Sequence, residues 1–216
     1  MFVVAHKVNS AAVARSLRGT GIDHVELDVR LTRERIVLSH FQKVVWAGGW
    51  LERDNARIRL REGPPYDASI EDIIALLPDD VTIVFDPKDR ESVVRDHLAD
   101  VLANRVADPA RHVVSSRRVG DLRSFGRAGF RTWQTVDTPA QIRQLSQQQL
   151  VTDGVTVRHR ALTAAHVQAL HAVTDTVVAW TVNNERRAVE LAGMGVDGIT
   201  TDSRRVIDIV QAQPRQ

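Results

Sequence analysis

The sequence predicts a compact (β/α)8 barrel, with a short insertion after the strand that ends at His40. Short apolar runs rich in β-branched residues alternate with amphipathic helical segments along the 216 residues. This alternation implies parallel strands joined by right-handed crossovers. Polar side chains also follow several apolar runs, at the strand ends where barrels carry their functional groups. An open doubly wound sheet is the alternative, but its Gly-rich loop after the first strand is missing at residues 7–10.

Nine apolar runs define the predicted strands, and they are short enough for a small barrel. They cover residues 2–5, 22–29, 36–39, 81–86, 111–115, 130–136, 150–157, 176–182 and 196–200.

Helical patterns lie between these runs. Asn9 and Ser10 supply an N-cap for the first helix, and Ser69 opens another with a pattern like a capping box. Gly193 and Gly195 mark the end of the last predicted helix. The predicted helices cover residues 11–17, 69–77, 91–106, 120–127, 138–147, 163–171 and 184–193. We expect one domain over residues 1–210 and a frayed polar tail over 211–216.

Composition narrows the class of protein. Hydrophobic residues make up 43% of the chain, which is ample for one core, and the absence of Cys excludes disulfides and thiolate metal sites. No apolar stretch approaches the roughly 20 residues that span a bilayer, and the N-terminus has no basic region typical of a secretory signal. A cytoplasmic location is therefore expected. The net charge is +2 and the arginines are scattered among acids, so we expect no nucleic-acid partner.

An acidic pair lies on the second predicted strand. Glu26 and Asp28 are two residues apart and share a face, whereas Val25 and Leu27 point to the other face. Two carboxylates placed together repel unless a proton or a cation relieves them. With Asp86 at the end of a later strand, they predict an oxygen-only site for Mg²⁺ or Ca²⁺. The alternative is a surface pair bridged to arginine.

Two histidines each follow an apolar run. His6 ends residues 2–5 and His40 ends residues 36–39. A lone histidine there is more often structural, but two beside an acidic pair can act as proton donor and acceptor. Lys88 shares a face with Asp86 if the strand continues past Pro87, and its ammonium could hold an anionic oxygen.

Aromatic residues gather in the connection over residues 41–68, which holds Trp46, Trp50 and Tyr66 among glycines and prolines. Because it follows His40, we expect it to form a wall or lid over the predicted site. Trp180 closes another predicted strand, where it could line the pocket or pack in the core.

Taken in order, the motifs resemble the glycerophosphodiester phosphodiesterase family, within the phosphatidylinositol-phospholipase-C-like phosphodiesterase superfamily. The resemblance runs from residue 2 to about residue 205, through the motifs at 5–7, 26–28, 39–40, 86–88, 179–183 and 195–202. It implies a TIM-barrel enzyme in which His6 and His40 act as general acid and base. It also implies Mg²⁺ or Ca²⁺ on Glu26, Asp28 and Asp86. Glycerophosphodiesters would be cleaved to glycerol 3-phosphate and an alcohol, with Lys88 and Lys7 on the phosphoryl oxygens.

Several positions depart from the family pattern. Lys7 and Val8 stand where the family has Arg and Gly, Phe41 stands where Asp is usual, and Asp86 replaces Glu. Lysine keeps the charge but loses the bidentate fork of arginine. The Asp-x-Lys motif is closer to sphingomyelinase D-type phospholipases, so a lysophospholipase D activity is one alternative. A catalytically silent barrel that binds phosphodiesters is another, and the sequence leaves the oligomeric state open.

Overall fold

The computed structural model describes residues 1–32, 35–40, 42–46, 49–54, 57–61, 69–89, 91–148 and 151–212. For residues 42–46, 49–54 and 57–61 it describes the backbone but not the side chains.

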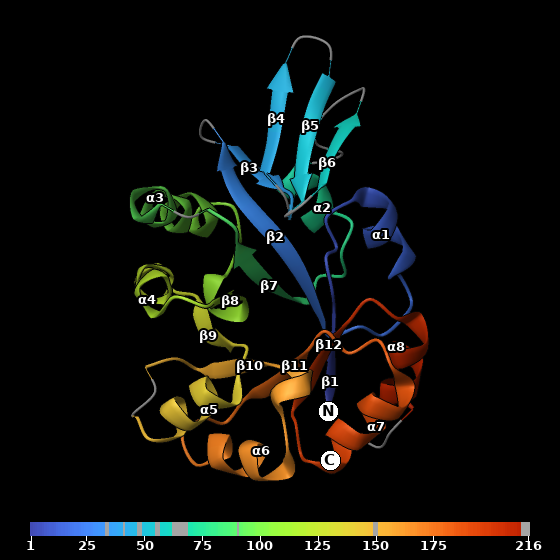
Figure 1. Cartoon of the computed structure of the whole chain (residues 1–216). Coiled ribbons are helices and arrows are strands. Elements are labelled where there is room, and N and C mark those ends of the chain that lie inside the picture. Colours follow the sequence, from blue (N-terminus) through green and yellow to red (C-terminus); the bar gives the residue numbers. More distant parts are fainter. Residues whose placement is uncertain are drawn as a thin grey trace.

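Eight parallel strands form a closed barrel (Figure 1). The order around the barrel is β1-β12-β11-β10-β9-β8-β7-β2, and pairing of β1 with β2 closes it. The predicted (β/α)8 barrel is therefore confirmed. The strands are β1 (Phe2–Ala5), β2 (His24–Thr32), β7 (Thr82–Pro87), β8 (Val113–Ser116), β9 (Arg131–Val136), β10 (Gly154–Arg158), β11 (Val177–Trp180) and β12 (Gly198–Thr201).

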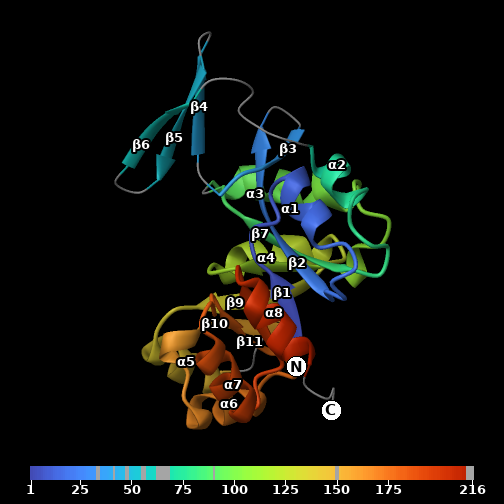
Figure 2. The same cartoon turned by 90° about the vertical axis from the view of Figure 1, so that its right-hand side faces the viewer.

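A helix lies between each pair of consecutive barrel strands, and a further helix follows the last strand. Ser10 caps the first helix and Ser69 forms the expected capping box with Asp72. The helices cover the outside of the barrel (Figures 1 and 2). They are α1 (Ala11–Ser16), α2 (Ile70–Ile74), α3 (Ser92–Ala103), α4 (Val119–Arg127), α5 (Pro139–Ser146), α6 (Ala164–His171), α7 (Glu185–Gly193) and α8 (Arg204–Gln211).

The run at 36–39 is not a barrel strand. β3 (Arg35–Leu38) pairs antiparallel with the second half of β2, from Val29 opposite Leu38 to Thr32 opposite Arg35. β2 extends beyond its barrel partners, so the chain makes a hairpin and returns to the barrel rim at Ser39. The periodicity of a short apolar run cannot distinguish a parallel partner from an antiparallel one.

The insertion after His40 contains a second sheet. Three antiparallel strands, β4 (Gln42–Trp46), β5 (Gly49–Asp54) and β6 (Arg57–Arg61), project beyond the end of β2 (Figures 1 and 2). The expected connection is thus a small meander. Tyr66 and the side chains of Trp46 and Trp50 lie outside the described residues, so the aromatic lid stays a prediction.

Helix α8 was not expected from the sequence. Ser203 caps it, and Val206, Ile207 and Val210 are buried on one face. Gln211 ends this helix and so does not belong to a frayed tail, while residues 213–216 lie outside the described residues. Among the helices that the structure describes, none is long and apolar enough to cross a membrane.

Candidate active site

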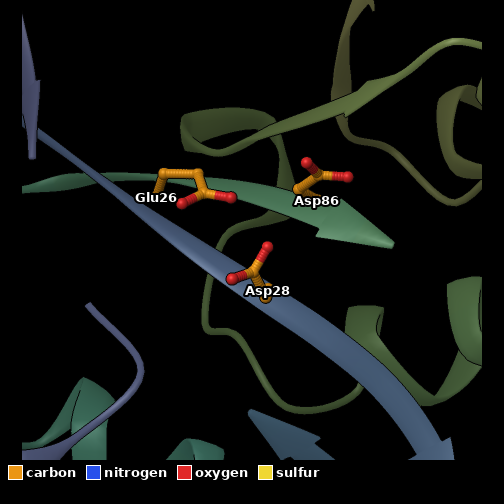
Figure 3. A group of neighbouring side chains, drawn as sticks. All are labelled: Glu26, Asp28 and Asp86. Atoms are coloured by element: carbon orange, nitrogen blue, oxygen red, sulfur yellow. The ribbon is translucent and has the colours of Figure 1, made fainter. Parts of the chain in front are cut away.

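Three carboxylates converge at the carboxyl end of neighbouring strands (Figure 3). Glu26 and Asp28 lie on β2 and Asp86 lies on β7, with Asp28 and Asp86 directly opposite in the parallel register. Each offers an oxygen within 4.8 Å of the other two. Glu26 is 5% exposed and Asp28 is fully buried, whereas the side chain of Asp86 is 27% exposed. The predicted acidic cluster therefore forms in the fold, and the salt-bridged surface pair does not.

Burial and mutual repulsion act on the ionisation of the acidic cluster. Burial, together with the nearby charges of Asp28 and Asp86, raises the pKa of Glu26 well above its usual range. Burial also opposes ionisation of Asp28, but the hydrogen bond from His40 and the charge of Lys88 outweigh it and lower the pKa of that carboxyl. Glu26 is thus the carboxylate that most needs an added cation.

Lys88 reaches back over the cluster. Its Nζ lies 2.7 Å from Asp28 Oδ1 and 2.5 Å from Asp86 Oδ2. Burial lowers the pKa of the Lys88 ammonium, but the charges of Asp86 and Asp28 raise it by more. The pKa therefore lies above its usual value, and Lys88 stays protonated. The shared face of Asp86 and Lys88 is confirmed, because β7 continues through Pro87.

Backbone and amide groups of the loop after β1 fix the acidic pair. Asn9 Nδ2 donates to Asp28 Oδ2 at 2.6 Å, and the backbone N–H of Asp28 donates to Asn9 Oδ1 at 2.9 Å. The backbone N–H of Lys7 donates to Glu26 Oε2 at 2.7 Å. Lys7 has a φ of 56°, a left-handed conformation that is uncommon for a residue with a Cβ. Asn9 is thus a partner of the site, and Ser10 alone supplies the helix cap.

His40 reaches the cluster through the β2–β3 hairpin. Its Nδ1 lies 3.0 Å from Asp28 Oδ1. The guanidinium of Arg30 holds this turn together, because it donates to the carbonyl oxygens of Ser39, His40 and Lys88. His40 therefore stands beside Asp28 although its strand lies outside the barrel.

His6 approaches from the other side of Glu26. Its Nδ1 lies 2.7 Å from Asp202 Oδ1, and its Nε2 lies 3.9 Å from Glu26 Oε2. Asn183 Nδ2 donates to the other oxygen of Asp202 at 2.9 Å. The hydrogen bond with His6 is the main cause that lowers the pKa of Asp202, so Asp202 is an anion that orients the imidazole.

The predicted site residues divide into two groups. The first group lies at the carboxylates of Glu26, Asp28 and Asp86 and also includes His6, His40 and Lys88. Lys7 joins this group through its backbone N–H. Trp180 ends β11 at the same end of the barrel, where its ring lies against the guanidinium groups of Arg117 and Arg158.

Four partners of the site were given no role in it from the sequence, although two of them, Asn183 and Asp202, lie in the motifs that carry the resemblance; the other two are Asn9 and Arg30. Asp202 follows the run at 196–200, so the rule that singled out His6 and Asp86 applied to it as well. Asn9 and Arg30 gave no such signal, since their contacts depend on how the loop and the hairpin fold back onto β2.

Fold and site together define a (β/α)8 barrel with an acidic centre and two histidines held by carboxylates. A sequence model of the glycerophosphoryl diester phosphodiesterase family matches residues 74–205. The chain belongs to this family, and its enzyme class is that of a glycerophosphodiester phosphodiesterase.

Known proteins are similar over almost the whole chain. YhdW of Bacillus subtilis, provisionally named a glycerophosphodiester phosphodiesterase, is 24% identical over 229 residues, covering 94% of each chain. The phosphodiesterase OLEI02445 of Oleispira antarctica, solved with its product sn-glycerol-3-phosphate, has a TM-score of 0.76 at 17% identity, covering 98% of this chain and 97% of that one. The glycerophosphodiester phosphodiesterase of Agrobacterium tumefaciens has a TM-score of 0.72 at 13% identity, covering 98% of this chain and all of that one.

Proposed function

We propose that the protein hydrolyses glycerophosphodiesters to glycerol 3-phosphate and an alcohol, using a divalent cation and the pair His6 and His40. One observation carries this proposal: two histidines flank the cluster of three carboxylates, and a carboxylate holds Nδ1 of each histidine. The product named for the Oleispira phosphodiesterase supports the substrate class.

The donor set suits a hard cation. Glu26, Asp28 and Asp86 supply carboxylate oxygens alone, which favours Mg²⁺ or Ca²⁺ over softer metals. The raised pKa of buried Glu26 reports a place where added positive charge is stabilising. A cation bound here would neutralise the phosphodiester and polarise it for attack.

The two histidines carry the proton transfers. Asp202 holds Nδ1 of His6 and Asp28 holds Nδ1 of His40, so Nε2 is the nitrogen of each ring that exchanges a proton with the substrate. One imidazole takes the proton of the attacking nucleophile. The other returns a proton to the alkoxide that leaves.

The lysines hold the phosphoryl oxygens. Lys88 bridges Asp28 and Asp86, so its ammonium stays fixed and protonated beside the place of the diester. The charge of Lys7 also helps to lower the pKa of Asp202, so its ammonium lies on the His6 side of the cluster. Cations fixed in this way stabilise the charge that develops on phosphoryl oxygens in the transition state.

The test is release of glycerol 3-phosphate from glycerophosphocholine and glycerophosphoglycerol, with lysophosphatidylcholine as a parallel substrate. We expect EDTA to abolish activity and Mg²⁺ or Ca²⁺ to restore it. His6→Ala and His40→Ala should each lower kcat by about 10²–10⁴-fold. The exposed His171 of α6 gives the control variant His171→Ala, which should leave the rate unchanged.

Full activity after exhaustive dialysis against EDTA would contradict the metal assignment. Wild-type rates in either His6→Ala or His40→Ala would remove that residue from the proton transfers. Turnover of lysophosphatidylcholine alone would favour the lysophospholipase D alternative.

A further inference from the structure

A second group of side chains lies across the barrel end from the histidines. The guanidinium carbon of Arg117 lies 5.2 Å from the ring centroid of Trp180, and that of Arg158 lies 5.8 Å from it. Arg158 and Trp180 are paired in the register of β10 and β11, and Arg117 directly follows β8. Arg117, Arg158 and Trp180 are called the arginine–tryptophan group below.

This group continues the rim on which the carboxylates lie. β7, which carries Asp86, pairs with β8, and Arg117 follows β8 by one residue. The hydrogen bond with Asp137 is the main cause that raises the pKa of Arg117, while burial lowers it. The charge of Asp86 adds a smaller increase, so Asp86 and Arg117 are near enough to interact. A substrate whose diester lies on the carboxylates can therefore extend along the rim toward Arg117.

The ion pairs leave the group with an excess of positive charge. Asp137 forms hydrogen bonds with Nε and Nη2 of Arg117 at 2.8 and 3.3 Å. Arg158 has no ion-pair partner among the residues that the structure describes, so one charge stays uncompensated. The Trp180 indole N–H is neutral and buried, without an acceptor in the described part of the chain, so the excess charge comes from the arginines alone.

The same arrangement disfavours a cationic head group. A quaternary ammonium binds best over the face of an aromatic ring, and here guanidinium groups already lie within 6 Å of the Trp180 ring. Asp137, the carboxylate that could attract an ammonium, is engaged by Arg117. A second anion, in contrast, would find two guanidinium groups.

Resting on the proposed function, we infer that the arginine–tryptophan group is a subsite for the alcohol portion of the diester and selects alcohols that carry a second phosphate or carboxylate. The glycerol portion has only neutral hydroxyl groups, so the extra negative charge must belong to the alcohol. Arg158 is the specificity-determining residue of this subsite, and Arg117 supports it.

The experiment compares kcat/KM for glycerophosphoinositol 4-phosphate, glycerophosphoglycerol and glycerophosphocholine, whose alcohols are anionic, neutral and cationic. We expect the wild-type enzyme to prefer the first over the last by about tenfold or more. Arg158→Gln should reduce that preference by about threefold to tenfold, because it should lower kcat/KM for glycerophosphoinositol 4-phosphate more than for glycerophosphoglycerol. Raising the salt concentration should narrow the preference, because exposed charges are screened.

Arg160→Gln is the matched control, since Arg160 is also exposed and lies two residues from Arg158. It removes the same net charge without altering the arginine–tryptophan group. Equal effects of Arg158→Gln and Arg160→Gln, or a wild-type preference for glycerophosphocholine, would overturn the inference.

Calorimetric binding of inositol 4-phosphate separates the two proposals. Affinity that falls in Arg158→Gln but not in Arg160→Gln supports the subsite even if no diester is hydrolysed, in which case the proposed function fails alone. Hydrolysis of all three diesters with identical binding by wild type and Arg158→Gln would instead reject the subsite and leave the proposed function standing.

Discussion

The two ends of the barrel use their residues in opposite ways. At the carboxyl end, Glu26, Asp28 and Asp86 bring three acids within 4.8 Å, and two histidines and a lysine surround them. At the amino end, the rings of Phe2 and His24 stack with centroids 4.3 Å apart, and Trp133 lies 6.1 Å from Phe2.

The amino end is built for packing. Gly154 and Gly198 begin β10 and β12, and a Cβ at either position would overlap the ring of Trp133 or Phe2. Carboxylates occur here too, but Asp153 and Asp197 accept backbone N–H groups of Thr132 and Val177 and so cap strand starts. Among the described residues, the group of three acids close enough to share a cation lies at the carboxyl end, which is the pattern of a functional site held by a stable scaffold.

The largest effect is expected from the centre of the cluster. Asp28→Asn removes the charge that holds both Lys88 and His40, and we expect kcat/KM to fall by about 10³-fold or more. Asp197→Asn is the matched change at the amino end and should leave kcat/KM of the folded enzyme unchanged. Steady-state kinetics with unfolding curves for both variants would check this, and equal losses of activity would contradict the contrast between the ends.

A smaller effect on activity is expected at Asp202, which positions His6 without reaching the substrate. Asp202→Ala removes the anion that orients the imidazole, so kcat should fall by about 10²-fold while KM changes little. Asp202→Asn should lose at least as much, because the amide lacks the negative charge and, with its oxygen facing Asn183, turns an N–H toward Nδ1 of His6 and favours the other tautomer. A rise in KM with kcat intact would show that Asp202 acts on binding and not on the orientation of His6.

At the amino end the expected effect is on stability. Gly198→Ala places a methyl group against Phe2 and should lower the free energy of unfolding by about 1–3 kcal/mol. Gly193→Ala, at the end of α7, meets no atom within 4 Å and should be neutral or slightly stabilising. Urea unfolding measures both, and Gly198→Ala combined with Phe2→Ala should lose less stability than the sum of the two single losses if overlap is the cause.

The last effect is a pH dependence of stability that arises at the same end and vanishes above about pH 7. Burial, only partly offset by Asp23, lowers the pKa of His24 from 6.5 to about 4, so the folded state favours the neutral ring. The unfolded chain binds the proton more readily, and stability is therefore lost as the pH falls from about 6.5 to about 4. The loss should be on the order of 3 kcal/mol.

The comparison between wild type and His24→Phe separates the pH-dependent stability that His24 contributes from the part contributed by carboxylic acids. The difference between their free energies of unfolding should change over that pH range and stay constant above about pH 7. A constant difference throughout would show that His24 is not buried as a neutral ring.

Much of the fold followed from local pattern. The alternation of apolar runs and helices predicted the barrel, and the E-x-D spacing placed Glu26 and Asp28 on one face because a strand repeats every two residues. The spacing of Asp86 and Lys88 placed them together for the same reason. α8 carried the same kind of signal, a Ser cap followed by Val206, Ile207 and Val210, and was missed although the periodicity was present.

Other features depended on partners far away in the sequence. The run before His40 has the composition of a barrel strand. Its composition does not reveal that it pairs antiparallel with β2 instead of joining the barrel. Gly154 and Gly198 gave no sign that two rings lie against them.

The sequence by itself therefore determined the class of fold and the carboxylates of the acidic centre, because the periodicity of strands and helices is set by residues only a few positions apart. Only the tertiary structure decided that His40 meets Asp28, that Asp202 holds His6, and that Arg117 and Arg158 share Trp180. The first two contacts join residues 12 and 196 positions apart: the β2–β3 hairpin brings His40 to Asp28, and pairing of β1 with β12 in the closed barrel brings His6 to Asp202. Local pattern carries no information about which strand ends become neighbours when a sheet closes on itself.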